Sequence, residues 1–494
     1  MNQLLLVAPV LLPIAGGILM LMIPEKEARV HPIFTELIVL ASSAMIWAVL
    51  FTGREQGNGA VLFSMAGNLK VFFRMDGMGA VFSGLVSVLW PLATLYAFEY
   101  MEGDRRGREF FAFYTMTYGV TLGIALSGNL VTLYLFYELL TLVTFPLVLH
   151  DRTKEAIRAS RKYLYYSIGG AAFAFIGLVF VLIYGSTADF TLGGVLNKGV
   201  PGFDTNVILF MYVLAFFGFG VKAALFPVHS WLPSVSVAPT PVTALLHAVA
   251  VVKSGAFAIL RLTYFSYGAD FLKGTWAHYV VLGAVLVTIV YGSTMAVKEV
   301  HFKRRLAYST ISNLSYVLLG AVMMSAAGMA AALSHLVFHA FMKICSFFCA
   351  GAVMHQAGRN YVYELDGIGK KMPVTLACFT IAGLSLTGIP LFAGFISKWN
   401  IAQAAVGLGG IPGFLAAGVL LYSALMTGIY MMTVVVRAYF PKEGYDETAL
   451  DGVKEPGWRM LTPIVIFAAV ILFFGLYSRP LFHFLQQTAG GSGI

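Results

Sequence analysis

Several residues that can gain or lose a proton lie inside the most apolar runs of this sequence. They are one glutamate, Glu138, and four lysines, Lys222, Lys253, Lys343 and Lys398. A charged side chain in such a run is costly unless it is paired, hydrated or neutralised, and intramembrane charges commonly mark ion or proton paths. The pattern therefore favours transfer of protons or cations between side chains that change their charge.

Glu138 lies midway along the run LYLFYELLTLVTFPLVLH and has no charged residue beside it in the sequence. A carboxylate at such a position is either protonated or paired with a cation. Lys222 is the nearest candidate within the same group of predicted helices. The competing interpretation is a static ion pair that ties two helices together.

Histidines accompany two of the lysines. His247 precedes Lys253 by six residues, which is more than one helical turn. This spacing predicts a relay bridged by water instead of a direct contact. A histidine that is simply satisfied within the core is the alternative for His247.

The run AALSHLVFHAFMKICSFFCAG places His335, His339 and Lys343 at positions i, i+4 and i+8. Three titratable groups then share one helix face over about 12 Å, a geometry that suits a proton wire. It suits a metal site less well, because Cys345 points to another face and the run supplies no carboxylate ligand.

Two proline- or glycine-interrupted stretches carry these lysines. The first runs from Gly218 to Arg261 and holds Pro227, Pro233, Pro239 and Pro241 between Lys222 and Lys253. The second, LSLTGIPLFAGFISKWN, carries Lys398 beside its break. Proline removes a backbone donor, so a membrane helix opens there only where protein or water satisfies the freed groups. Broken helices of this kind mark binding sites in transporters.

The composition predicts an all-α polytopic membrane protein: 59% of residues are hydrophobic, 11% are charged, and the mean hydropathy is +0.82. A span needs about 20 apolar residues. We predict fourteen transmembrane helices, near residues 3–23, 33–52, 77–99, 109–127, 129–149, 162–184, 206–227, 240–262, 278–297, 305–325, 328–354, 373–400, 411–436 and 460–478.

The broken helices are the seventh and the twelfth of these spans, and each is fourth in a group of five. We therefore predict two five-helix half-channels, at 106–265 and 266–440, the second inverted relative to the first because five is odd. A three-helix segment at 1–105 precedes them. A C-terminal helix and tail follow at 441–494.

Basic residues predict the orientation. Twenty-one of the 32 lysines and arginines fall in loops after odd-numbered spans, and seven fall in the other loops. By the positive-inside rule both termini lie on the non-cytoplasmic face. The same rule accounts for the net charge of +9, so nucleic acid is not expected as a partner. The first apolar run is followed by PEKEAR instead of a cleavage site, which predicts a retained span.

No cofactor or metal is expected on the chain itself. The cysteines, Cys345, Cys349 and Cys378, are too few for a four-thiolate iron–sulfur cluster, and all three lie in apolar runs. No phosphate-binding loop and no hydrolytic triad occurs in a convincing context. The sequence thus offers no catalytic residues, and enzymatic activity would belong to a larger complex.

The strings FYELLTL, VKAALFPVHSWLP, HAVAVVKSGAFAILR, SHLVFHAFMKICSFFCAG and GIPLFAGFISKW resemble the antiporter-like subunits shared by respiratory complex I, membrane-bound [NiFe] hydrogenases and Mrp cation/proton antiporters. The resemblance runs from about the third span to the thirteenth. It implies fourteen helices, two inverted half-channels and a central hydrophilic axis. On this axis the proton or ion path would comprise Glu138, Lys222, His247, Lys253, His335, His339, Lys343 and Lys398.

Two departures narrow the resemblance. Some members of the family have glutamate where Lys398 stands, so this chain is similar to the lysine-bearing kind. The largest complex I subunit of the type continues into a long lateral helix, whereas this sequence ends at Ile494 soon after its last predicted span. We therefore do not expect it to be that subunit.

The resemblance implies a multi-pass protein of the prokaryotic cytoplasmic membrane that moves protons, or exchanges Na⁺ for protons, within a redox-driven complex. A membrane-bound hydrogenase is the complex we expect. Iron–sulfur clusters and a [NiFe] centre or flavin would then lie on partner subunits, in a cytoplasmic redox arm joined to other membrane subunits. The alternatives are a subunit of a stand-alone Mrp-type Na⁺/H⁺ antiporter, a transporter of an anionic solute, and a scaffold whose charges serve packing alone.

Overall fold

A helix occupies each of the fourteen predicted spans in the computed structural model, which describes residues 3–22, 30–52, 59–65, 69–442, 444–445 and 447–490. Within these residues eleven helices are long and apolar enough to cross a membrane. The first half of the chain contributes α1 (Leu4–Met22), α2 (Val30–Thr52), α3 (Gly77–Tyr100), α4 (Gly107–Ala125), α5 (Leu130–Val148), α6 (Lys154–Tyr184), α7 (Thr205–Lys222), α8 (Trp231–Ser234), α9 (Thr240–Ala248) and α10 (Val251–Leu260).

The second half of the chain contributes α11 (Ala269–Leu272), α12 (Trp276–Lys298), α13 (Phe302–Ala321), α14 (Ala326–Ala357), α15 (Ile368–Lys371), α16 (Pro373–Thr387), α17 (Ala393–Leu408), α18 (Gly410–Tyr439), α19 (Trp458–Leu476) and α20 (Arg479–Thr488). Short 3₁₀ segments are η2 (Val235–Val237), η4 (Val362–Glu364) and η5 (Glu447–Leu450). Three basic residues counted in the charge asymmetry, Lys26, Arg29 and Arg54, lie outside the described residues.

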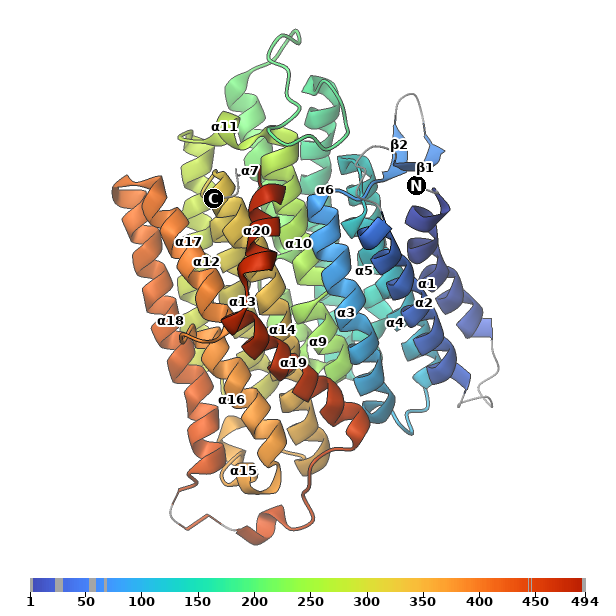
Figure 1. Cartoon of the computed structure of the whole chain (residues 1–494), viewed down its shortest axis with the longest axis vertical. Helices are drawn as coiled ribbons and strands as arrows, with labels where there is room; N and C mark the ends of the chain where they lie inside the picture. The colour runs from blue at the N-terminus through green and yellow to red at the C-terminus, as the bar shows by residue number, and fades with distance from the viewer. Residues whose placement is uncertain are drawn as a thin grey trace.

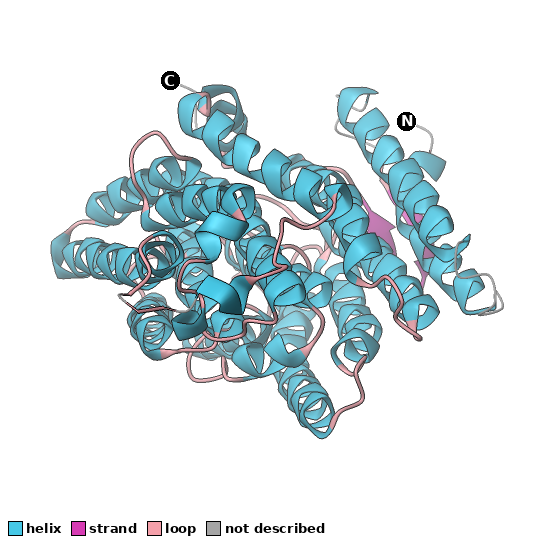
Figure 2. Cartoon of the chain, turned by 90° about the horizontal axis from the view of Figure 1, so that it is seen from below, coloured by secondary structure: helices cyan, strands magenta, loops and turns pink. Residues whose placement is uncertain are grey.

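The long helices run roughly side by side, and α1 begins on the side of the molecule where α20 ends (Figure 1). Seen from below, the two N-terminal helices stand at one flank (Figure 2). Two elements are enclosed by the others: the most apolar 18-residue windows of α14 and of the helix from Thr240 to Tyr267 are entirely buried. Both carry residues of the predicted path.

The two predicted breaks are present. α7 ends at Lys222, and non-helical backbone with a cis Phe226–Pro227 bond leads to α8. The twelfth span is divided into α16 and α17, with Gly388 at φ +93° where α16 ends. A Cβ at Gly388 would lie 2.9 Å from Cδ of Lys398, so glycine leaves room for the lysine at the break.

The eighth span differs from the uninterrupted helix that the sequence predicts. It consists of α9, a break at Val249–Ala250, α10, and a π-helix, η3 (Arg261–Tyr267). Such π-helices are rare and occur frequently at functional sites. The break separates His247 from Lys253, and η3 begins at Arg261.

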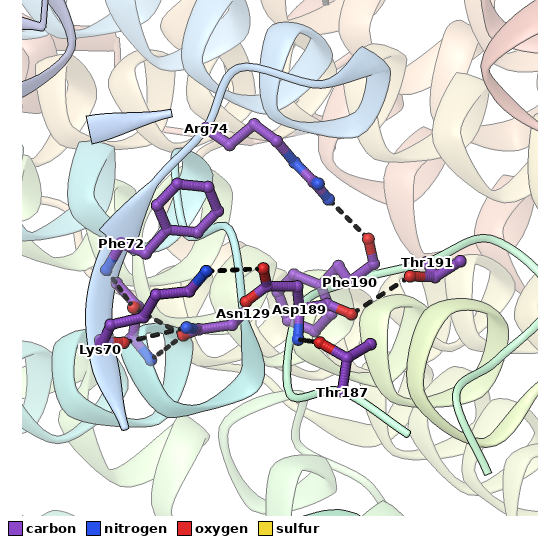
Figure 3. A network of polar contacts seen from close by, with 9 residues as sticks. Lys70, Phe72, Arg74, Asn129, Thr187, Asp189, Phe190 and Thr191 are labelled. Atoms are coloured by element: carbon purple, nitrogen blue, oxygen red, sulfur yellow. Dashed lines mark hydrogen bonds and ion pairs between the residues drawn. The ribbon is translucent and has the colours of Figure 1, made fainter. Parts of the chain in front are cut away.

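The structure adds a β-hairpin that the sequence did not predict. β1 (Ala60–Ser64) pairs antiparallel with β2 (Lys70–Phe73). Lys70 forms an ion pair of 2.8 Å with Asp189, and Nη2 of Arg74 donates to the Phe190 carbonyl at 2.6 Å (Figure 3). Asn129, the N-cap of α5, donates to the Lys70 carbonyl at 2.9 Å. The hairpin thus bonds to Asn129 and Asp189, which lie in the region predicted as the first half-channel.

Candidate functional site

The first titratable group of the predicted path lies between α5 and α7. Glu138 is half-buried, and its Oε1 is enclosed without a hydrogen-bond partner. Lys222 is fully buried at the end of α7, where Nζ donates to the Tyr137 carbonyl and lies 3.5 Å from the centroid of the Tyr137 ring. Glu138 and Lys222 interact electrostatically but form no direct ion pair. The lysine is therefore held by neutral groups next to a carboxylate.

His247 and Lys253 do not contact each other, in agreement with their spacing. His247 is fully buried, neither of its ring nitrogens has a hydrogen-bond partner, and its ring lies 4.9 Å from that of Phe347. Buried polar atoms of this kind are ordinarily satisfied by ordered water. Lys253 Nζ instead contacts Nδ1 of His339 on α14.

The two histidines of α14 continue from Lys253. His339 and His335 are fully buried, and their rings stack with centroids 5.5 Å apart. His335 Nδ1 lies 2.8 Å from Oγ of Ser397, the residue before Lys398 on α17. Lys253, His339, His335 and Ser397 therefore form one line of polar side chains across the interior from α10 to α17.

Lys343 shares the α14 face with the histidines but turns toward α13. It is fully buried, and Nζ donates to the Leu306 carbonyl at 3.0 Å and to Oγ of Ser309 at 2.7 Å. It makes no hydrogen bond with His335 or His339. The three groups that the spacing places together thus have two different sets of partners.

Lys398 lies on α17, and its side chain reaches back across the break to α16. Its Nζ donates to the carbonyls of Leu386 and Thr387 at 2.5 and 3.2 Å, at the C-terminal end of α16. A cation is favoured there by the helix dipole and by the unpaired carbonyls. Nζ also lies 5.0 Å from the centroid of the Tyr316 ring, which is 5.3 Å from the ring of His335.

A buried ion pair between Arg261 and Asp76 lies at the C-terminal end of α10, the helix that carries Lys253. Asp76 caps α3 by accepting from the Gly79 amide at 2.8 Å. Arg261 lies at the end of the predicted eighth span, 240–262, and is fully buried in η3. Both of its terminal nitrogens donate to Asp76 at 2.6 Å.

Several hydrogen-bond partners of the predicted path residues could not be predicted from the sequence. Tyr137, Ser309, Tyr316 and Ser397 are hydroxyl residues within apolar runs, where their type does not separate a path from ordinary helix packing. Lys303 is buried and donates to the Ala238 carbonyl at 2.9 Å, although its position in the sequence predicts a loop. Lys303 precedes Arg304 and Arg305, and clusters of basic residues usually lie at the membrane surface, so its burial could not be predicted from the sequence.

The side chains described at this site are of types that can pass protons between neighbours. Lysine and imidazole both accept and release protons, and hydroxyl groups relay them. Within the described residues no group of three His, Cys, Asp or Glu side chains is placed to hold a metal ion. The arrangement accordingly fits ion translocation.

Residues 127–427 match the family described as NADH:quinone oxidoreductase/Mrp antiporter, transmembrane part. NADH-quinone oxidoreductase subunit N of Desulforudis audaxviator (strain MP104C) is 31% identical over 419 residues, which is 82% of each chain. Na(+)/H(+) antiporter subunit A1 of Staphylococcus aureus (strain Newman) is 28% identical over 85% of this chain and 54% of the relative.

The fold is also known from a solved structure. The Mrp complex from Dietzia sp. DQ12-45-1b contains a chain that superposes with a TM-score of 0.87, at 20% sequence identity, over 99% of this chain and 97% of that one. The similarity in fold thus covers 99% of this chain, and the family match covers most of the two predicted half-channels. This chain belongs to the NADH:quinone oxidoreductase/Mrp antiporter family and is one of its proton-conducting, multi-pass membrane subunits.

Proposed function

We propose that this chain moves protons, or exchanges a cation such as Na⁺ for protons, as a membrane subunit of a redox-driven complex related to complex I. The observation that carries the proposal is the line of buried side chains from Lys253 through His339 and His335 to Ser397, beside Lys398. A scaffold would gain nothing from burying so many titratable groups, because desolvated charge is expensive.

The proposed mechanism begins at Glu138. This residue is half-buried on α5, so a neighbouring subunit can reach it and alter its distance from Lys222. Moving the carboxylate changes how strongly Lys222 holds its proton. The proton then passes through Lys253 and the two histidines to Lys398 and leaves the protein, and His247 supports a branch bridged by water.

A redox-driven complex is the first candidate because a relative that aligns over 82% of each chain is named as a subunit of NADH-quinone oxidoreductase. A membrane-bound hydrogenase is the complex that we propose, with iron–sulfur clusters and a [NiFe] centre or flavin on partners. In the prokaryotic cytoplasmic membrane, both termini would face away from the cytoplasm.

Purification of the affinity-tagged chain from its native membranes in a mild detergent tests this assignment. Mass spectrometry should identify hydrogenase large and small subunits, and electron paramagnetic resonance should show iron–sulfur signals that co-purify with the chain. A complex of small membrane subunits without iron–sulfur proteins would contradict the redox assignment and leave ion exchange in place.

A stand-alone Mrp-type antiporter is the second candidate, supported by the similarity to the Na(+)/H(+) antiporter subunit A1. It differs in its energy source. A Na⁺ gradient across vesicles containing the purified complex would then drive proton movement without any electron donor, whereas a redox-driven complex would require its donor.

A further inference from the structure

The contact between α13 and α18 is lined by polar side chains. Six of them are fully buried: Ser309, Asn313 and Tyr316 on α13, and Ser423, Thr427 and Tyr430 on α18. The spacing places each set of three on one helix face. Ser309 bonds Tyr430 and Tyr316 bonds Ser423, so the two faces run antiparallel. We call these six residues the hydroxyl seam.

One end of the hydroxyl seam begins at Lys343. Its Nζ donates to Oγ of Ser309 at 2.7 Å, and this oxygen lies 2.7 Å from Oη of Tyr430. Tyr430 Oη in turn donates to Oγ1 of Thr427 at 3.1 Å. An unbroken chain of hydrogen bonds therefore leads from the Lys343 ammonium through the hydroxyl groups of Ser309, Tyr430 and Thr427.

The other end of the seam lies beside Lys398. Tyr316 Oη donates to Oγ of Ser423 at 2.5 Å, and that oxygen lies 2.5 Å from Oγ of Ser293 on α12. The Tyr316 ring is the ring that Nζ of Lys398 faces at 5.0 Å. The seam thus spans the region between the two lysines of the second half-channel.

Asn313 occupies the middle of the seam. Its Nδ2 donates to the Ser309 carbonyl at 2.9 Å and to Tyr430 Oη at 3.4 Å, while its buried Oδ1 has no hydrogen-bond partner. Thr427 and Ser423 are one turn apart on α18, about 6 Å along the axis. Thr427 Oγ1 donates to the Ser423 carbonyl at 2.7 Å, so a bridging water would have to join the two hydroxyl groups.

We propose that the hydroxyl seam is a second proton connection between Lys343 and Lys398, independent of His335 and His339. The inference rests on the proposed proton translocation. Each hydroxyl accepts a proton on one side and donates its own on the other, and water would carry the proton from Thr427 to Ser423 and from Tyr316 to Lys398. Lys343 thus loses one proton, Lys398 gains one, and every hydroxyl ends reprotonated. The competing explanation is that the seam only holds two membrane helices together by hydrogen bonds.

The test compares variants of the intact complex in vesicles, using a pH-sensitive dye to follow the initial rate of proton movement. In a His335→Gln background the histidine line is cut, and we expect part of the wild-type rate to remain. Adding Tyr430→Phe or Tyr316→Phe should then lower that remaining rate roughly tenfold or more, because a relay hydroxyl is lost.

Tyr422→Phe is the matched control. Tyr422 also lies on α18, but its hydroxyl bonds Thr294 at 2.8 Å outside the seam. In the same background it should leave the rate unchanged. Blue native gels and thermal unfolding should show equal assembly of all variants; a rate loss that merely follows lost stability would support the packing explanation and overturn the proposal.

Two further outcomes separate the seam from the proposed function. If His335→Gln alone abolishes proton movement, or if both phenylalanine variants keep the remaining rate, the seam carries no protons. If Lys343→Met and Lys398→Met both leave the wild-type rate unchanged, proton translocation through this chain is itself wrong, and the seam falls with it.

Discussion

At the scale of single residues, the four intramembrane lysines are held by acceptors that carry no full charge. Lys222, Lys343 and Lys398 donate to backbone carbonyls, and Lys253 contacts a histidine. A fixed carboxylate in direct contact would keep an ammonium permanently charged, because an adjacent anion favours the charged form. Neutral acceptors leave each lysine able to release its proton.

Glu138→Gln keeps the size of the side chain and removes the anion beside Lys222. We expect normal assembly and a fall in proton movement of roughly tenfold or more, since the lysine loses the charge that modulates it. The initial rate in vesicles measures this effect. Glu36→Gln is the control, because Glu36 lies on α2 outside the predicted path. A wild-type rate in Glu138→Gln would remove the proposed pairing.

Lys398→Met preserves volume but cannot carry a proton. We expect the complex to assemble and to keep at least part of its electron transfer, while the protons moved per electron fall sharply. The measurement is that ratio in reconstituted vesicles, with Lys371→Met on the loop side of α16 as control. An unchanged ratio in Lys398→Met would place the exit elsewhere.

The charged members of the candidate site could be predicted from the sequence because charge in an apolar run is conspicuous. Lys222 and Lys253 stand out in this way, and so do His335 and His339 through their helical spacing. Their partners could not be predicted: Lys343 turns to Ser309 and Lys253 to His339, and only the packing of α10, α13 and α14 decides these contacts. The roles of these residues stay predictions.

At the scale of elements, the helix breaks marked by proline or glycine could be predicted from the sequence. The helix break that depends on packing against other helices could not. Four prolines mark the opening after α7, and Gly388 with Pro390 marks the one between α16 and α17. The interruption at Val249–Ala250 has no proline or glycine and depends on the surrounding helices. Short strands such as β2, with four residues, give too little alternation to recognise.

Asp76→Asn should destabilise the protein by about 3–5 kcal/mol, because it leaves the fully buried guanidinium of Arg261 without its carboxylate. Thermal unfolding of the purified protein in detergent measures the loss. The matched control is Asp189→Asn, which breaks the partly exposed pair with Lys70 and should cost at most about 1 kcal/mol. Equal losses would show that burial does not distinguish the two pairs.

The same ion pair predicts that the stability of the folded protein depends on pH. Burial raises the pKa of Asp76, but the charge and hydrogen bonds of Arg261, the Gly79 amide and the charge of Arg74 together hold that pKa below its ordinary value. The resulting stabilisation is complete above the pKa of an unfolded aspartate, about 3.9, and is lost as the pH falls through the lowered pKa. Unfolding midpoints should therefore drop more steeply in acid for the wild type than for Asp76→Asn.

At the scale of the whole molecule, the charge asymmetry predicts which loops face the cytoplasm. Cysteines introduced at Arg105 and Lys198, both exposed, lie in loops on opposite predicted sides. In sealed right-side-out vesicles an impermeant maleimide should label Lys198→Cys at once and Arg105→Cys only after permeabilisation. The native cysteines are buried and provide a low background. The reverse labelling would invert the proposed topology.

The whole fold was the most predictable part, because hydropathy and basic residues are averaged over many positions. Helices occupy all fourteen predicted spans, and eleven of them qualify by length and composition. Of the other three, α4 and α13 are less apolar, and the twelfth span is divided into α16 and α17, which are each shorter than 18 residues. The polar side chains of α4 and α13 face other helices, which hydropathy along one chain cannot distinguish from a surface. The inverted relation of the two half-channels stays a prediction.

Lys398, the proposed proton carrier, also joins two helices, because it lies on α17 and donates to the carbonyls of Leu386 and Thr387 at the end of α16. Charge-assisted hydrogen bonds are roughly twice as strong as neutral ones. If Lys398 carries protons as proposed, each departure of a proton would weaken the contact between α16 and α17, and each return would strengthen it. A force that separates the two helices would then also favour release of the proton.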